Sequence, residues 1–112
     1  MWEFKSTGKP FELTPQVELA LLRVGQEAVY NTVRHADANR VAMTLQWNAG
    51  SVNLVITDDG IGFVVDDATG AIDSAHGLPA MKERARESGA TLEIRSIPGA
   101  GTSVTMKVPS QR

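Results

Sequence analysis

One stretch of the sequence carries polar and charged residues at helical spacing, and their types suit a bound metal–phosphate group. Glu27, Asn31 and His35 follow one another at intervals of four residues, which places them along one ridge of a helix. Arg23 extends this ridge by one turn, and Arg34 lies beside His35. Mg²⁺ prefers oxygen ligands and keeps several waters, so one Asn oxygen together with phosphate oxygens can hold it. The alternative interpretation is a solvated helix face with an Arg23–Glu27 ion pair.

Three glycine-bearing segments provide a second set of candidates. Residues 58–62 (Asp-Asp-Gly-Ile-Gly) directly follow a strand pattern. A carboxylate there can accept a hydrogen bond from an exocyclic amine, and the glycines let the backbone come close to a ligand. Residues 76–78 (His-Gly-Leu) precede a second helix, whose free N–H groups can bind an anion. Residues 99–102 join the last two strands. Taken one by one, these segments are equally consistent with a surface turn, a helix start and a hairpin turn.

The composition and the absent motifs exclude several other functions. The 112 residues include no Cys and only two His, which excludes disulfides, thiolate metal sites, a Cys nucleophile and a three-His zinc centre. Neither a Gly-x-Ser-x-Gly elbow nor a Walker-type phosphate loop is present. With 11 Lys and Arg against 13 Asp and Glu, the net charge of −2 gives no electrostatic drive towards nucleic acid. No apolar run approaches the ~18 residues of a membrane span, and no secretory signal is visible. We therefore expect a cytoplasmic location, no membrane contact by this domain and no nucleic-acid partner.

The hydrophobic periodicity predicts the elements that must position these residues. Thr14 and Pro15 suit the cap and first position of a helix, and an apolar stripe continues that helix to about Ala36. Apolar residues alternate in four later segments, which is typical of strands. In chain order we expect a short strand and extended lead-in over 2–13, a helix over 16–36, a hairpin of strands over 41–47 and 52–58, a loop over 60–79, a second helix from Leu78 that Gly89 stops, and strands over 92–96 and 102–108.

These elements predict one α+β domain over residues 1–112. The strands come in hairpin pairs, so the sheet should be mostly antiparallel, and the helices must cover one of its faces in a two-layer sandwich. The apolar fraction of 42% and the charged fraction of 21% are those of a soluble globular protein large enough for one core. We expect a monomer, because no apolar stripe remains once the sheet is covered.

The order and spacing of the motifs resemble the GHKL ATPase superfamily. Residues 26–36 (QEAVYNTVRHA) resemble its N box, residues 58–63 (DDGIGF) its G1 box, residues 76–85 (HGLPAMKERA) a short form of its G2 region, and residues 98–102 (PGAGT) its closing Gly-x-Gly-Thr. The short G2 form and the Asn-x-x-x-His-Ala helix end are most similar to histidine kinases of the NarL-partner subfamily. The resemblance implies a Bergerat fold, which is an α/β sandwich with a mixed, mostly antiparallel sheet covered on one face by helices. ATP would lie between the long helix and the 60–79 loop, a lid that we expect to be disordered without nucleotide.

The resemblance also implies a role for each matched position. Asn31 would coordinate an Mg²⁺ ion that bridges the phosphates. Glu27 would be the catalytic acidic residue, polarising the attacking group or holding the waters of the metal. Asp58 would accept a hydrogen bond from the adenine amino group, and Thr102 would support it directly or through water. The other ATP-binding positions implied in this way are Arg34, His35, Gly60, Gly62, His76, Gly77 and Leu78.

A histidine kinase is the function that this resemblance implies. The domain would position Mg-ATP for γ-phosphoryl transfer to a His on a separate dimerisation domain of the same kinase, with a response regulator downstream. Both His residues of this chain fall in matched motifs, so we expect it to lack an acceptor of its own. Such a domain can form the cytoplasmic end of a membrane-bound sensor.

Two alternatives stay open. A stand-alone GHKL serine kinase of the anti-sigma-factor type shares the N and G1 boxes, and only the form of the lid argues against it. A non-catalytic interaction domain could keep the same fold without binding nucleotide, but the intact Asn31, Asp58 and Gly60 argue against that.

Overall fold

The computed structural model describes residues 2–32, 40–60, 78–97 and 99–109, which form one sheet and two helices. The elements in chain order are β1 (Trp2–Gly8), α1 (Pro15–Asn31), β2 (Val41–Trp47), β3 (Ser51–Asp58), α2 (Leu78–Glu87), β4 (Thr91–Ile97) and β5 (Gly101–Pro109). Each corresponds to an element expected from the sequence. The expected extension of the long helix to Ala36 and the expected lid fall largely on residues 33–39 and 61–77, which lie outside the described residues.

The sheet has five strands in the order β1-β2-β3-β5-β4. β1 runs parallel to β2, whereas the other three neighbouring pairs are antiparallel. Parallel neighbours need a long crossover connection, and α1 supplies it between β1 and β2. The expectation of a mixed, mostly antiparallel sheet is therefore confirmed, with β2–β3 and β4–β5 as its hairpins.

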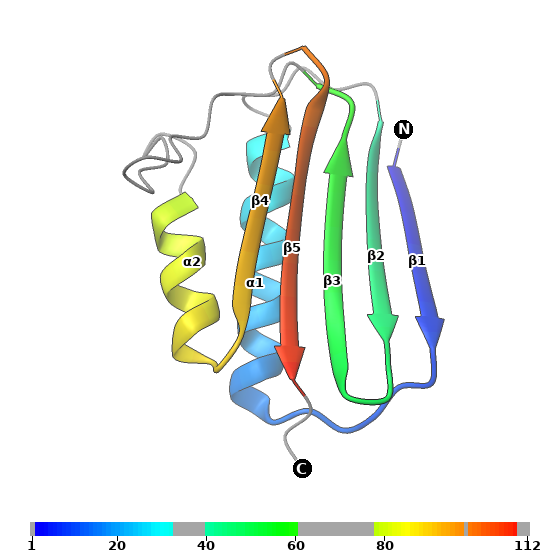
Figure 1. The fold of residues 1–112 in the computed structure, drawn as a ribbon, viewed down its shortest axis with the longest axis vertical. Helices are drawn as coiled ribbons and strands as arrows, with labels where there is room; N and C mark the ends of the chain where they lie inside the picture. The colour runs from blue at the N-terminus through cyan, green and yellow to red at the C-terminus, as the bar shows by residue number, and fades with distance from the viewer. Residues whose placement is uncertain (1, 33–39, 61–77, 98, 110–112) are drawn as a thin grey trace.

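Both helices lie on one face of the sheet; in Figure 1, α1 is seen behind β4 and β5, and α2 lies to the side of β4. The apolar stripe of α1 is buried there, with Val17 and Val24 at 1% and 0% exposure. Met81 of α2 and Met106 of β5 are also fully buried. The buried side chains of both helices and of strands β2, β3 and β5 form a single cluster. This arrangement confirms the two-layer α+β sandwich.

The start of α1 follows its sequence signal. The Thr14 hydroxyl accepts a hydrogen bond from the Val17 N–H at 3.3 Å, and Pro15 occupies the first turn, where its missing N–H costs nothing. Glu18 in the same turn complements the positive end of the helix dipole. Because this cap fixes where the helix begins, it also fixes which residues reach the opposite end.

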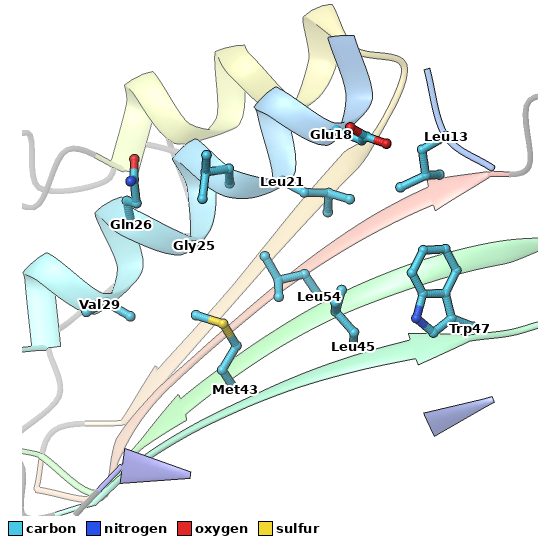
Figure 2. A pocket seen from close by; sticks show the side chains of 11 residues that line it. Leu13, Glu18, Leu21, Gly25, Gln26, Val29, Met43, Leu45, Trp47 and Leu54 are labelled. Carbon is cyan, nitrogen blue, oxygen red and sulfur yellow. The ribbon is translucent and has the colours of Figure 1, made fainter. Parts of the chain in front are cut away.

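An apolar cavity of about 500 Å³ lies between α1 and the strands β2 and β3. Figure 2 shows Leu21 and Gly25 of the helix facing Met43 and Leu54 of the sheet across this space. Gly25 has no side chain to fill it, so the helix backbone itself forms part of the wall. Among the helices of the described part, neither is long and apolar enough to cross a membrane.

Candidate functional site

The polar residues of the site gather at one end of the sheet. The last turn of α1, the end of β3, the end of β4 and the start of β5 all reach this end, at the top of Figure 1. Asp58 is the last residue of β3 and lies opposite Thr102 in the β3–β5 ladder. Thr102 in turn lies opposite Ser96 in the β4–β5 ladder. Side chains directly opposite one another in a ladder share a face, so these three form a polar row across the sheet.

Two donors hold the Asp58 carboxylate, one on each oxygen. The Thr32 hydroxyl, at the end of α1, donates to Oδ2 at 3.1 Å, and the Gly60 N–H donates to Oδ1 at 2.9 Å. The second bond is a local turn in which an Asp side chain caps the backbone two residues later. Since Thr32 belongs to α1, its bond shows that Asp58 faces the helix layer. Each carboxylate oxygen has two lone pairs, so both keep capacity to accept from a ligand.

Thr102 and its neighbours line the adjacent part of this end. The Thr102 hydroxyl lies 2.9 Å from the Ser96 hydroxyl, and either oxygen could be the donor. Gly101 brings the start of β5 against β3: its φ is +102°, and a Cβ there would lie 2.1 Å from the Asp58 carbonyl oxygen. Only glycine fits at such a distance and in that backbone conformation. Gly101 therefore sets how closely Thr102 approaches Asp58.

Asp59 has a different role from Asp58, although the two are adjacent. Its Oδ1 accepts from the Arg40 N–H at 2.9 Å, and its own N–H donates to the Arg40 carbonyl at 3.3 Å. These bonds tie the end of β3 to the start of β2. Both aspartates border a hollow of about 270 Å³, whose other lining residues are Glu3, Arg40, Val41, Ala42 and Thr57.

The structure brings together three of the residues expected from the sequence, namely Asp58, Gly60 and Thr102. Glu27 is half-buried on α1, one turn before Asn31. Asn31 ends α1 and Leu78 begins α2, but their side chains are outside the described part. The remaining expected residues, Arg34, His35, Gly62, His76 and Gly77, lie outside the described residues. Their roles stay predictions.

Sequence reasoning missed Thr32 and Ser96. The hydroxyl of Thr32 is buried against the carboxylate, with the residue 5% exposed, and Ser96 contacts Thr102 from the neighbouring strand. The only hint of Thr32 in the sequence is its residue type: Thr is a mediocre helix former and often forms side-chain hydrogen bonds near helix ends. The sequence contains no hint of Ser96, since its contact with Thr102 depends on the register between β4 and β5.

The residue types at the end of α1 include two with side-chain oxygens, the kind of ligand that Mg²⁺ prefers. The described residues contain no group of three or more His, Asp or Glu that could hold a metal by itself. Glu27 and Asn31 nevertheless place two oxygen-bearing residues on the last two turns of α1. Mg²⁺ is commonly bound by one or two protein oxygens together with substrate phosphates and water.

The only residue with a resolved pKa shift in the described part lies away from this end. A hydrogen bond from Arg86 to the Glu83 carboxylate on α2 raises the pKa of Arg86 above its usual value. This pair is exposed, so it adds little stability.

Comparison with known families gives a match over residues 16–112. The matching family is described as histidine kinase-, DNA gyrase B-, and HSP90-like ATPase. The sensor protein VraS of Staphylococcus saprophyticus is 40% identical over 99 residues, which cover 88% of this chain. VraS of Staphylococcus haemolyticus is 38% identical over 102 residues, which cover 91% of the chain. The chain spans only 28% of the length of either protein.

Solved structures have the same fold. The histidine kinase AdeS of Acinetobacter baumannii matches with a TM-score of 0.78 at 16% identity, over 99% of this chain and 54% of that one. The histidine kinase domain of the blue-light activated histidine kinase from Erythrobacter litoralis EL346 matches with a TM-score of 0.69 at 18% identity. That match covers 96% of this chain and 54% of the other. At these identities the likeness concerns the fold alone.

Proposed function

The chain belongs to the family of histidine kinase-, DNA gyrase B- and HSP90-like ATPases, and on this premise we propose that it is the ATP-binding, catalytic domain of a sensor histidine kinase. Within the family, the relatives described as sensor proteins favour this function over a serine kinase or a non-catalytic domain. From the short G2 motif we further propose that the parent kinase is of the NarL-partner type. The domain would span residues 1–112.

The observation that carries this proposal is the fixed carboxylate of Asp58. Two donors hold its oxygens, and the lone pairs that remain can accept a hydrogen bond from the amino group of adenine. Thr102 lies opposite and can bond the ring directly or through water. Gly60, whose N–H caps Asp58, would let the base pass close to the backbone, because it has no side chain.

The phosphates would lie towards the end of α1 and the start of α2. We assign Asn31 as the residue that holds Mg²⁺, and bound Mg²⁺ would neutralise charge on the phosphates. Glu27 would polarise the attacking group or hold waters of the metal. Arg34, His35, Gly62, His76, Gly77 and Leu78 would complete the nucleotide site, the last three around the N-terminus of α2, where free N–H groups favour an anion.

The partners follow from the same proposal. The γ-phosphoryl group would pass to a His on a separate dimerisation domain of the kinase, and from there to a response regulator. In that transfer this domain supplies positioning and charge stabilisation rather than a covalent intermediate. It would act at the cytoplasmic end of its sensor and as a monomer when isolated.

Calorimetric titration of Mg-ATP into the purified chain tests the proposal. Asp58→Asn should weaken binding at least about tenfold, because an amide N–H₂ replaces one acceptor of a charge-assisted bond. Asp59→Asn is the matched control and should change affinity less than about twofold, since the bonds of Asp59 with the N–H and carbonyl of Arg40 tie the end of β3 to the start of β2.

A chain that binds no Mg-ATP, and whose melting temperature does not respond to millimolar nucleotide, would contradict an ATP-binding function. A chain that binds ATP should next be mixed with a separate dimerisation domain. Label from γ-³²P-ATP on the His of that domain would then identify a histidine kinase, whereas label on a partner Ser would identify a serine kinase.

A further inference from the structure

Thr32 connects the long helix to the carboxylate that would recognise the base. We propose that Thr32 is a positioning residue, which orients the Asp58 carboxylate and so sets the preference for a purine that carries a 6-amino group. This inference rests on the proposed function, because it assumes that the nucleotide base binds beside Asp58. It adds a residue that none of the sequence motifs assigned to the site.

The single proton of the Thr32 hydroxyl has two possible acceptors. The oxygen lies 3.1 Å from the Ala28 carbonyl and 3.1 Å from Asp58 Oδ2. The Ala28 carbonyl, however, already accepts the backbone N–H of Thr32. A bond to an ionised carboxylate is also the stronger of the two. We therefore assign the hydroxyl proton to Asp58, the stronger acceptor, since the Ala28 carbonyl already has one hydrogen bond without it.

The environment of the bond makes it hard to replace. Thr32 is 5% exposed, so water has little access to the position that the hydroxyl occupies. The two residues are 26 positions apart in the chain, and their bond joins the last turn of α1 to the end of β3. The orientation of Asp58 is thus coupled to the packing of the helix against the sheet.

Fixing the Asp58 carboxylate requires both donors, the Gly60 N–H and the Thr32 hydroxyl. The terminal torsion of an Asp side chain is broad, so one hydrogen bond leaves the carboxylate free to turn. Gly60 N–H fixes Oδ1 and Thr32 fixes Oδ2, and together they hold the carboxylate plane. The lone pairs that remain then point in fixed directions, which is what recognition of one amino group requires. Without the Thr32 hydroxyl, the Asp58 carboxylate would lose this fixed orientation.

The test compares two nucleotides on five forms of the chain, namely the unchanged chain and four variants. Affinities for the magnesium complexes of ATP and of purine riboside 5′-triphosphate, which has hydrogen in place of the 6-amino group, are measured by calorimetry. Thr32→Val keeps the shape of the side chain but removes its proton. We expect it to weaken ATP binding about tenfold while changing the affinity for the purine analogue less than about twofold. Thr32→Ser, which keeps the hydroxyl, should stay within about threefold of the unchanged chain for ATP.

Thr105→Val provides the matched control, since Thr105 is half-buried on β5, on the opposite face of the sheet from Asp58. It should leave both affinities unchanged. Thr32→Ala removes the same hydroxyl without adding a methyl group, and it should reproduce the loss of selectivity if Thr32→Val folds poorly.

The possible results distinguish a failure of this inference from a failure of the proposed ATP-binding function. If the unchanged chain binds ATP but removal of the hydroxyl weakens both nucleotides equally, Thr32 has only a structural role and the inference is wrong. The same holds if removal changes neither affinity. If the unchanged chain binds neither nucleotide, the proposed function fails and the inference fails with it.

Discussion

At the scale of single residues, Gly101 has a strict steric requirement at this end of the sheet. A Cβ there would lie 2.1 Å from the Asp58 carbonyl oxygen, and its φ of +102° disfavours any side chain. Gly101→Ala should therefore lower the unfolding free energy by about 2–4 kcal/mol. The added Cβ would push β5 away from β3, and alanine is strained at this φ. Gly99 is the control: its φ is also positive, at +82°, but nothing lies within 4 Å of its Cβ position. Gly99→Ala should cost only about 1 kcal/mol in the same urea titration, and equal costs would contradict the steric argument.

The residues around Asp58 show which parts of the candidate site could be predicted from the sequence. The motifs that contain Asp58, Gly60 and Thr102 are local and could be recognised in the sequence, and the structure places these residues close together. Their roles in ATP binding stay predictions. Thr32 could not be recognised in this way, since its partner lies 26 residues away and no local pattern encodes a contact between a helix end and a strand end. Whether Glu27 and Asn31 act as the motif implies is a prediction that stays open.

At the scale of elements, α1 contains a glycine that its own geometry does not require. A Cβ at Gly25 would meet Met43 Cε at 3.5 Å and Leu54 Cδ2 at 3.6 Å, which are ordinary contacts, in the apolar cavity of Figure 2. Gly25→Ala should stabilise the fold by about 1 kcal/mol, because alanine favours the helix and buries one more methyl group. Ala20→Gly, the reverse change at a buried position of α1, should destabilise it by at least a similar amount. A loss of stability in Gly25→Ala would mean that the helix cannot accept even a methyl group against the sheet.

Which strands pair was harder to predict than which segments are strands. The hairpins β2–β3 and β4–β5 follow from short turns in the sequence, and the structure confirms both. The parallel pairing of β1 with β2 and the placement of β5 between β3 and β4 had no comparable signal. Such contacts join distant segments and depend on the packing of α1 and α2 on one face, which periodicity in a single segment does not specify.

At the scale of the whole molecule, the candidate site and the core belong to one structural unit. Both helices and strands β2, β3 and β5 share a single buried cluster, and the polar row that contains Asp58 lies at one end of the same strands. A ligand bound there contacts elements that must all be folded, so it should stabilise the entire domain against unfolding and not merely one segment of it. Such a domain should unfold in one cooperative step.

This coupling gives a quantitative prediction for urea denaturation. Mg-ATP at a hundred times its dissociation constant should add about 2.7 kcal/mol to the unfolding free energy, since it binds only the folded state. The midpoint should rise while the m-value, which reflects the surface exposed on unfolding, stays the same. At the same nucleotide concentration, Asp58→Asn with its expected tenfold weaker binding should remove about 1.3 kcal/mol, roughly half of the rise, and more if binding is weaker still. Without nucleotide the midpoint should not depend on protein concentration, as expected of a monomer, whereas a midpoint that rises with concentration would indicate a dimer. A change in m-value on adding nucleotide would instead mean that part of the chain unfolds separately, and that the site and the core are not one unit.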